Sequence, residues 1–451
     1  MCLIEIGVEE RGMAHYIEIT SIDDQISLLP QMENDEIKEK RKVDHLISIN
    51  ERIDEMFEDL DKSSIKTCFI FKVNVWLRES NSDAYTPKMV AIGPYHKKNP
   101  QLDPMEKYKL LYLRRFLQRK EGLDVKSCIS ELQKLKEEAL KCYDDIEELG
   151  NDSQFCQMLL LDGCFVVEFI RERSEMCPEG ENKIININDN YIFRDLMLLE
   201  NQLPFFVLNQ LHDMTKQDDE LPLAILANNV FTFFVDLPKM TPESFRKTMK
   251  KSNHNKKRHM IMLNATELSE AGVRFAKIGN INRNKDNIRD MTSLFDIKFE
   301  NGLMTIPCLQ VKDTTETLLR NLIAYEQQSS DVQPKYFSDY ATFMDYLIDS
   351  DKDVNLLHRK GIIENWIGED KEVASLFNKI GNGVTVYSTF YYNEECIKAI
   401  QHCEQPWNRM KANLRHNYFN SPWAGALTVA AIILLLLTAT QTVLAFTGAV
   451  K

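Results

Sequence analysis

The sequence predicts a mainly α (α+β) fold: one large helical domain with a small β-hairpin element, followed by a single C-terminal transmembrane helix. Apolar residues recur three and four positions apart in many segments, which is the period of an amphipathic helix. Asn301-Gly302 separates two β-like runs and indicates the hairpin. Residues 417–450 contain no charged residue and indicate the transmembrane helix.

The membrane span is placed at residues 424–446, whose sequence is AGALTVAAIILLLLTATQTVLAF. A helix of this length crosses a hydrocarbon core of about 30 Å. Arg409, Lys411 and Arg415 precede the span, and basic residues tend to stay on the cytoplasmic side. We therefore expect residues 424–446 to have the lipid bilayer as partner, with the large N-terminal domain in the cytosol.

Composition limits the classes of function. The 451-residue chain has 55 Lys and Arg against 68 Asp and Glu, and this net charge of −13 argues against a nucleic-acid binder. Its ten cysteines form no C-x-x-C pair, so we expect reduced thiols, as in the cytosol. The N-terminal sequence MCLIEIGVEERGMAHYIEI lacks the apolar core of a signal peptide. Insertion of the C-terminal span would then follow translation.

The N-terminal half is predicted to be a leader followed by helices. Residues 1–36 show no sustained periodicity and form an irregular leader, whereas residues 37–415 form the large domain. Residues 66–96 contain prolines and a glycine and are expected to be non-helical. Amphipathic helices are predicted at 36–60, 104–117 and 125–149, and almost wholly apolar core helices at 155–172 and 192–211. We expect Pro204 at the first turn or at a break of the last of these.

Residues 246–259, RKTMKKSNHNKKRH, have no apolar periodicity and are predicted to form an exposed basic loop within the domain. Seven Lys or Arg residues lie between positions 246 and 258. This charge is either simply solvated or attracts anionic lipid headgroups or a nuclear import receptor. His254 and His259 within the loop are interpreted as solvated.

The C-terminal half combines the hairpin with further helices. Residues 260–278 are predicted to mix a short strand and a helix, before the hairpin. Further helices are predicted at 314–327, 337–350, 353–368, 371–380 and 393–413. Gly381 and Gly383 lack the third glycine of a nucleotide-binding loop and are interpreted as the turn that ends a helix.

Four carboxylates lie inside the apolar core segments: Asp162, Glu168, Asp195 and Glu200. A carboxylate at low dielectric has a raised pKa and could act as a general acid. Alternatively, the four are structural and cap helices, bond backbone amides or pair with arginine. The nearby arginines are Arg171, Arg173 and Arg194. Since the chain contains no P-loop, nucleophile elbow or zinc-protease motif, no catalytic residue is predicted.

A zinc site is the one metal site considered. His402 and Cys403 are adjacent, and Cys396 lies about two helical turns earlier. Adjacent side chains on a helix cannot both face one metal ion well. No metal-binding residue, cofactor-binding residue or cofactor is therefore predicted.

Eight strings occur in order over about residues 45–446. They are VAIGPYHKKNPQLDPMEKYKLLYLRRFL (90–117), MLLLDGCFVVEFI (158–170), DLMLLENQLPFFVL (195–208), ATELSEAGVRFAK (265–277), IPCLQV (306–311), LRNLIAYEQ (319–327), DYLIDSDKDVNLLHRKGII (345–363) and NSPWAGA before the span. Together they resemble a plant-specific family named only as domain of unknown function 247, also called uncharacterised protein family 481. Many relatives have a His-Gly pair where this chain has Lys97-Lys98, a difference that affects local loop shape.

The resemblance implies a single-pass plant membrane protein, at the plasma membrane by analogy, with no established catalytic activity. Some members are implicated in grass self-incompatibility, and others in growth or stress phenotypes. The family defines no catalytic residues, so the matching motif positions specify either fold or function. These positions are Gly93, Pro94, Tyr95, His96, Asp162, Gly163, Glu200, Asn201, Gln202, Pro204, Glu326 and Gln327.

Two functions from different classes follow. The first is a membrane-anchored interaction protein, not an enzyme, which binds an unidentified protein partner in signalling or recognition. The alternative is a membrane-bound hydrolase or transferase that uses the buried carboxylates. An inverted topology, with the domain outside the cytosol, would make Asn151 and Asn264 available for glycosylation, because both lie in sequons.

Overall fold

The computed structural model describes residues 70–144, 152–174, 184, 189–235, 262–278, 294–329, 332–385, 390–410, 413 and 422–448. The chain divides into two units, Met1–Lys66 and Thr67–Lys451, and the described residues all belong to the second. The predicted leader at 1–36, the helix at 36–60 and the basic loop at 246–259 lie outside the described residues and stay predictions.

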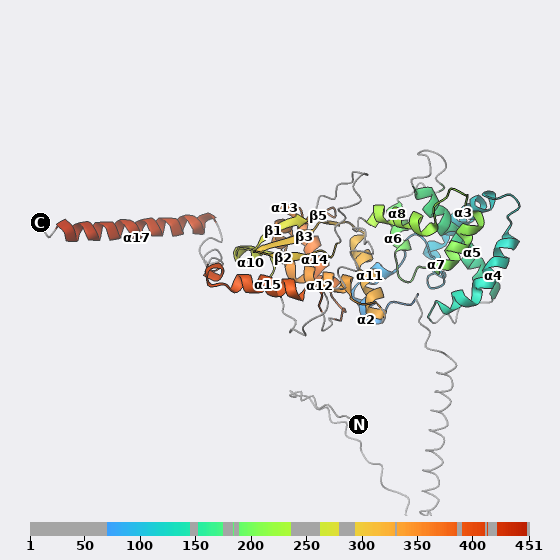
Figure 1. The fold of residues 1–451 in the computed structure, drawn as a ribbon, viewed down its shortest axis with the longest axis horizontal. Coiled ribbons are helices and arrows are strands. Elements are labelled where there is room, and N and C mark those ends of the chain that lie inside the picture. Colours follow the sequence, from blue (N-terminus) through green and yellow to red (C-terminus); the bar gives the residue numbers. More distant parts are fainter. Residues whose placement is uncertain are drawn as a thin grey trace, which may run out of the picture. The chain divides into compact units, whose positions relative to one another are not determined.

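Most of the described chain is helical, as predicted (Figure 1). The helices of the first half are α2 (Val75–Ser80), α3 (Glu106–Gln118), α4 (Val125–Lys141), α5 (Asp152–Arg173), α6 (Asp189–Leu196), α7 (Phe205–Thr215) and α8 (Leu223–Val235), with 3-10 turns η1 (Ser82–Tyr85) and η2 (Pro100–Met105). Asp124 begins α4 by accepting the Ser127 amide at 2.8 Å. Pro204 lies at the N-cap of α7, so the expected break at this residue is confirmed.

Helix α5 forms the centre of the first hydrophobic core. Sixteen of its 22 residues are buried, and α3, α4, α7 and α8 pack around it (Figure 1). Gly163 permits the close approach of α7, because a Cβ at this position would overlap the Leu211 side chain. A helix that is buried on nearly all sides must be apolar on nearly all sides. The prediction of a core helix at 155–172 is therefore confirmed.

Three details of this half differ from the prediction. Residues 66–96 contain the short helix α2 and the turn η1, where no helix is expected. Helix α4 ends at Lys141 rather than at 149. On α3, Leu111 is 41% exposed while Lys109 is only 2% exposed. Lys109 is turned inward because it pairs with Asp162 of α5, a contact that the apolar pattern alone does not reveal.

A three-stranded sheet has the order β1-β3-β2, and its strands are β1 (Arg274–Ile278), β2 (Lys298–Glu300) and β3 (Leu303–Pro307). Strands β2 and β3 are antiparallel and form the predicted hairpin. Asn301 and Gly302 join them with φ angles of 51° and 72°, the positive values that a type I′ turn requires. The parallel pairing of β1 with β3 and of β4 (Leu309–Val311) with β5 (Ile363–Asn365) is not predicted.

The second half packs helices with these strands around a second hydrophobic core. Its helices are α10 (Ala265–Glu270), α11 (Thr315–Gln328), α12 (Tyr336–Leu347), α13 (Asp351–Arg359), α14 (Asp370–Ile380) and α15 (Asn393–Glu404). The helix predicted at 353–368 ends at Arg359, because Gly361 has a φ of 70° and the chain then enters β5. Gly381 follows the last residue of α14, which confirms the interpretation of a helix-ending turn.

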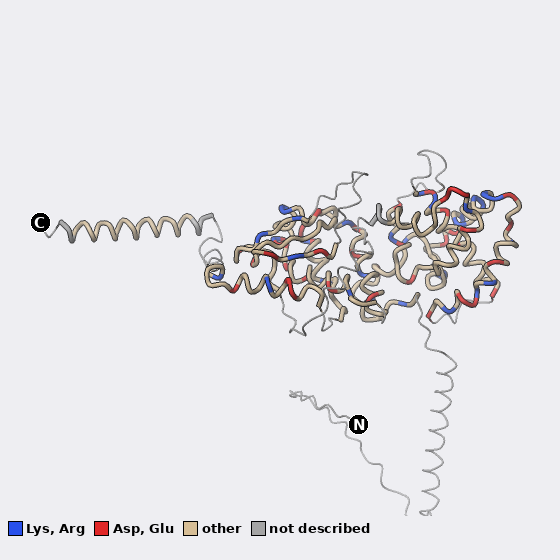
Figure 2. Tube along the Cα trace, in the orientation of Figure 1, with Lys and Arg blue, Asp and Glu red and all other residues tan. Residues whose placement is uncertain are grey.

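Helix α17 (Pro422–Gly448) coincides with the predicted span. Two described helices are long and apolar enough to cross a bilayer, namely α5 and residues Ala426–Ala445 of α17. In α5, 78% of the apolar window is buried in the protein, whereas none of the window in α17 is buried. Figure 2 shows no charged residue along α17.

Candidate functional site

The candidate site is built around the backbone of residues 88–93, called the 88–93 segment below. The segment belongs to no helix or strand. Nevertheless, five of its six amides donate hydrogen bonds to side-chain oxygens: Lys88, Met89, Val90, Ile92 and Gly93. Backbone amides that leave water require such partners. The accepting side chains come from α5, α6 and the turn between α6 and α7.

Asp195 of α6 accepts three of these amides. Its Oδ2 lies 2.9 Å from the Lys88 nitrogen, 2.6 Å from that of Met89 and 3.0 Å from that of Val90. Its Oδ1 accepts from Arg194 at 2.8 Å. Burial raises the pKa of Asp195, while the three amides and Arg194 oppose this rise. Asp195 therefore acts as an anchor for the backbone of the 88–93 segment.

Asn201 also holds the 88–93 segment, because its side-chain amide both accepts from and donates to the backbone of the segment, as a neighbouring strand would. Its Oδ1 accepts the Ile92 amide at 2.7 Å, and its Nδ2 donates to the Val90 carbonyl at 3.0 Å. The adjacent Gln202 holds its own turn, since its Nε2 donates to the carbonyls of Leu196 and Leu198 at 2.7 and 2.8 Å. The two amide side chains thus fix the junction between α6 and α7.

Asp162 of α5 holds the end of the segment. Its Oδ2 accepts the Gly93 amide at 2.9 Å, and its Oδ1 accepts from the Lys109 ammonium at 2.6 Å. Lys109 also donates to the Ala91 carbonyl at 2.7 Å and lies 2.6 Å from Glu106. Burial by itself would lower the pKa of Lys109, but the Asp162 carboxylate outweighs it and raises this pKa. Lys109 is therefore a buried cation that bonds both the segment and its anchor.

Glu200 joins the site to the start of the described chain. Its Oε1 accepts the Val73 amide at 2.6 Å and also bonds the Arg78 guanidinium. Its Oε2 lies 3.2 Å from His96 Nε2. Burial would raise the pKa of Glu200, but His96 and Arg78 outweigh burial and lower it. Glu200 is therefore held as a carboxylate.

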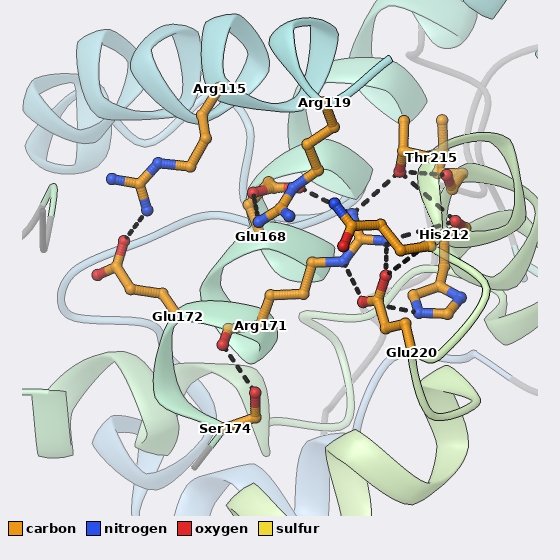
Figure 3. Close-up of polar contacts among 11 residues, drawn as sticks. Arg115, Arg119, Glu168, Arg171, Glu172, Ser174, His212, Thr215 and Glu220 are labelled. Carbon is orange, nitrogen blue, oxygen red and sulfur yellow. Dashed lines mark hydrogen bonds and ion pairs between the residues drawn. The ribbon is translucent and has the colours of Figure 1, made fainter. Parts of the chain in front are cut away.

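A second polar network crosses α5, α3 and α7 (Figure 3). The fully buried Glu168 receives two hydrogen bonds from Arg119, at 2.6 and 2.8 Å, and one from Arg171 at 2.8 Å. Arg171 also binds Glu220, at 2.6 and 3.1 Å. Burial, and then the neighbouring Arg171, lower the pKa of His212, which lies 3.2 Å from Glu220. Glu168 is thus enclosed by two guanidinium groups.

Three comparisons relate the chain to known proteins. A family profile described as plant protein of unknown function, domain of unknown function 247, matches residues 70–437. The chain belongs to this family. It is 27% identical to the UPF0481 protein At3g47200 of Arabidopsis thaliana over 429 residues, which cover 86% of this chain and 88% of the relative. It is 23% identical to the putative UPF0481 protein At3g02645 of the same plant over 508 residues, covering 88% and 93%. No solved structure matches the chain.

The motif residues of the domain of unknown function 247 come together in the candidate site from separate strings. Gly93 and His96 come from the first string, Asp162 from the second, and Glu200 and Asn201 from the third. Glu326 lies elsewhere: its carboxylate accepts the Phe337 and Ser338 amides at 2.9 and 2.8 Å and thereby caps α12. In this family member, the motifs hold the fold together.

The contacts of the four carboxylates identified in the apolar segments, Asp162, Glu168, Asp195 and Glu200, agree with a structural role. Each one bonds backbone amides, basic side chains or both, as the structural alternative expects. A pocket lies beside α6 and α11, and its lining includes Arg194 and Lys312 but none of the four carboxylates. The chemistry of a general acid needs a carboxyl group within reach of a substrate. All four residues are buried in the described part of the chain, with 4% exposure or less.

The described residues contain no group of three His, Cys, Asp or Glu side chains placed to hold a metal ion. Cys396 and Cys403 are buried in the second core, while His402 lies against Phe299 and Gly302. All the cysteines in the described ranges are free thiols. The other histidines considered above, His254 and His259, lie outside the described residues.

Sequence reasoning missed three basic partners of the carboxylates, Lys109, Arg119 and Arg78, although a signal exists for the first. The buried residues of α3 are Lys109, Tyr112, Leu113 and Phe116, spaced i, i+3, i+4 and i+7. A lysine in line with an apolar stripe indicates a buried cation that needs a carboxylate partner. Arg119 has no comparable signal, because it lies just past the end of α3.

Asp339 of α12 gives the fold a pH dependence. It is 4% exposed and accepts the Tyr391 amide at 2.8 Å. Burial raises its pKa from 3.8 to about 7; the Tyr391 amide opposes this rise, and the nearby Glu326 adds to it. The unfolded chain then binds fewer protons than the folded one between pH 4 and 7, so stability falls as pH rises through this range. The full loss by pH 8 is about 4 kcal/mol.

Asp339→Asn should remove this part of the pH dependence. Thermal unfolding is measured from pH 4.5 to pH 8 for the unmodified full-length protein and for the variant, both in detergent. The Tm of the unmodified protein should fall as the pH rises, relative to the Tm of the variant. Asp351→Asn is the control, since Asp351 is an exposed aspartate in the first turn of α13. Its pH profile should parallel that of the unmodified chain. Parallel profiles for Asp339→Asn would contradict the assignment.

Proposed function

We propose that this family member is a membrane-anchored protein: α17 is a single transmembrane helix, and the helical domain binds a protein partner in signalling or recognition. The observation that carries the anchor is the contrast between the two long apolar helices. α5 buries 78% of its apolar window in its own core, but the window of α17 at Ala426–Ala445 is 0% buried. So much apolar surface requires a nonaqueous environment.

The dimensions of α17 agree with this role. Its window of 20 residues spans about 30 Å at 1.5 Å per residue, which is the thickness of a hydrocarbon core. Three of its threonine hydroxyls are accommodated within the helix: Thr438, Thr440 and Thr442 donate to carbonyls four residues earlier at 2.7–2.8 Å. These hydroxyl groups therefore need no water.

The proposed side of the membrane is the cytosol, and the proposed membrane is the plasma membrane by analogy with the family. The basic residues Arg409, Lys411 and Arg415 before α17 support a cytosolic domain. The free thiols of the described cysteines agree with a reducing compartment. The role in recognition draws on the resemblance to family members implicated in self-incompatibility.

An interaction role suits the candidate site better than the hydrolase or transferase alternative. The carboxylates on which an enzyme would depend serve as anchors for the 88–93 segment and as partners of buried arginines. We propose that the chain acts through its surface and not through these groups.

The anchor is tested by a charge in the middle of the span. Leu436→Arg places a cation near the centre of α17 and costs about 3 kcal/mol of insertion free energy. We expect a fall in the fraction of protein that stays in plant microsomes after alkaline carbonate extraction. Leu427→Arg is the matched control, because Leu427 is 72% exposed against 63% for Leu436 but lies at the end of the window, where arginine reaches the interface. Equal retention of both variants would contradict a span at this position.

The same microsomes test the side of the membrane. An N-terminal tag should be digested by added protease, and glycosidase should cause no mobility shift. Protection of the tag, together with a shift that Asn151→Gln or Asn264→Gln reduces, would place the domain outside the cytosol and overturn the proposed location. The partner is tested by purifying the full-length tagged protein in detergent: a plant protein should copurify that is not retained by an unrelated single-span protein. Its absence would contradict the interaction role.

A further inference from the structure

A short helical stretch between α15 and α17 carries exposed apolar side chains. Residues 406–410 are helical, and within them Trp407 is 73% and Met410 53% exposed. The two residues are three positions apart and therefore lie on the same helix face. The neighbouring Arg409 is also exposed. A tryptophan and a methionine side by side on the surface require an explanation.

Hydrogen bonds join this stretch to the C-terminal end of α15. Asn408 donates from Nδ2 to the His402 carbonyl at 2.8 Å and to Gln405 Oε1 at 3.4 Å. The Arg409 amide donates to the Gln405 carbonyl at 2.9 Å. His402 belongs to α15, whose Cys403 is buried in the second core. Asn408 thus joins the stretch to the domain, while Trp407 and Met410 remain exposed.

The stretch is also close to α17 along the chain. Twelve positions separate Met410 from Pro422, the first residue of α17, and a chain of this length spans at most about 40 Å. The other exposed tryptophans have no such link, since Trp76 and Trp366 lie in distant parts of the sequence. If α17 is in the bilayer, Trp407 lies within reach of its surface.

We propose that residues 406–410 form an interfacial contact in which Trp407 and Met410 enter the headgroup layer of the membrane that α17 crosses. This inference rests on the proposed anchor. Tryptophan favours this layer because its ring is apolar and its N–H is polar. Arg409, with Lys411 and Arg415 in the following sequence, favours an anionic surface. The contact would fix the base of the domain against the bilayer.

The chain's four tryptophans allow a direct test. The full-length protein is reconstituted in phosphatidylcholine and phosphatidylserine vesicles with or without lipids brominated near the headgroup, and tryptophan quenching is measured. We expect Trp407 and Trp423 to be quenched, so Trp407→Phe should lower the quenchable emission by about half. Trp366→Phe is the matched control, because Trp366 is 66% exposed and should not change the quenching.

The outcomes separate this inference from the anchor on which it rests. If Trp423→Phe lowers the quenching but Trp407→Phe does not, α17 is inserted and the interfacial contact is wrong. If neither substitution lowers it, α17 is not in the bilayer and both proposals fail. Loss of quenching in Trp366→Phe instead of Trp407→Phe would assign the membrane contact to another face and overturn the inference. Since Trp407 is largely exposed, its substitution should leave the Tm unchanged.

Discussion

Gly93→Ala should destabilise the domain by more than about 3 kcal/mol, the largest effect that we expect from a single methyl group. Gly93 has a φ of +75°, which costs an L-residue about 1–2 kcal/mol. A Cβ at this position would also lie 2.5 Å from the Gln202 carbonyl oxygen, a backbone atom that is held in place. Tyr143 donates its hydroxyl to the same oxygen at 3.0 Å. The measurement is the Tm and denaturant midpoint of the full-length protein in detergent.

Gly122→Ala separates the two contributions. Gly122 has a φ of +78°, but nothing lies within 4 Å of a Cβ built there. Its substitution should therefore cost only the backbone term, about 1–2 kcal/mol. Equal losses at both positions would show that contact with the Gln202 carbonyl contributes nothing.

Glu168→Gln should cost about 2–3 kcal/mol, because it removes the charge of a fully buried carboxylate that accepts three hydrogen bonds from arginine. Arg171 keeps its second partner Glu220, and the Arg119 side chain is 27% exposed, so neither guanidinium is left buried and alone. Glu168 is 0% exposed, and Arg119 and Arg171 both bond it. The same substitution distinguishes a structural carboxylate from a catalytic one. A structural carboxylate loses Tm first, whereas a general acid would lose activity with its fold intact.

Glu131→Gln is the control for the loss of an ion pair as such. Glu131 pairs with Lys134 on the surface of α4, where the two side chains are 35% and 65% exposed. A pair of this kind contributes less than about 0.5 kcal/mol. If Glu168→Gln lowers the Tm no more than Glu131→Gln does, Glu168 does not stabilise the fold through its buried ion pairs.

Much of the fold could be predicted from local patterns in the sequence. α5 was recognisable from its apolar composition, the β2–β3 hairpin from Asn301-Gly302, and the start of α7 from Pro204. Each of these signals depends on a few neighbouring residues. The pairing of β4 with β5 was not recognisable, because the strands have three residues each and lie about 50 positions apart.

The candidate site could be predicted only in part, for a related reason. The four carboxylates were identifiable as charges inside apolar segments, and the nearby Arg171 and Arg194 were correctly named as pairing partners. The other partners lie far away in the sequence. Asp162 and Lys109 are 53 positions apart, and Glu200 and Val73 are 127 positions apart. The apolar periodicity of a segment depends only on neighbouring residues and does not predict contacts between residues so far apart in the sequence. Of these distant partners, only Lys109 could have been indicated by the sequence, because it lies in line with the buried residues of α3.

The dependence of the 88–93 segment on distant side chains has a consequence for synthesis on the ribosome. The acceptor of the Lys88 amide, Asp195, is synthesised 107 residues later, and the acceptor of the Ile92 amide, Asn201, is synthesised 109 residues later. At a translation rate of roughly 5–20 residues per second, these partners follow after about 5–20 seconds. During that time the nascent segment can satisfy its amides only with water or a chaperone. Folding of the first half is therefore completed only after the α6–α7 junction has left the ribosome.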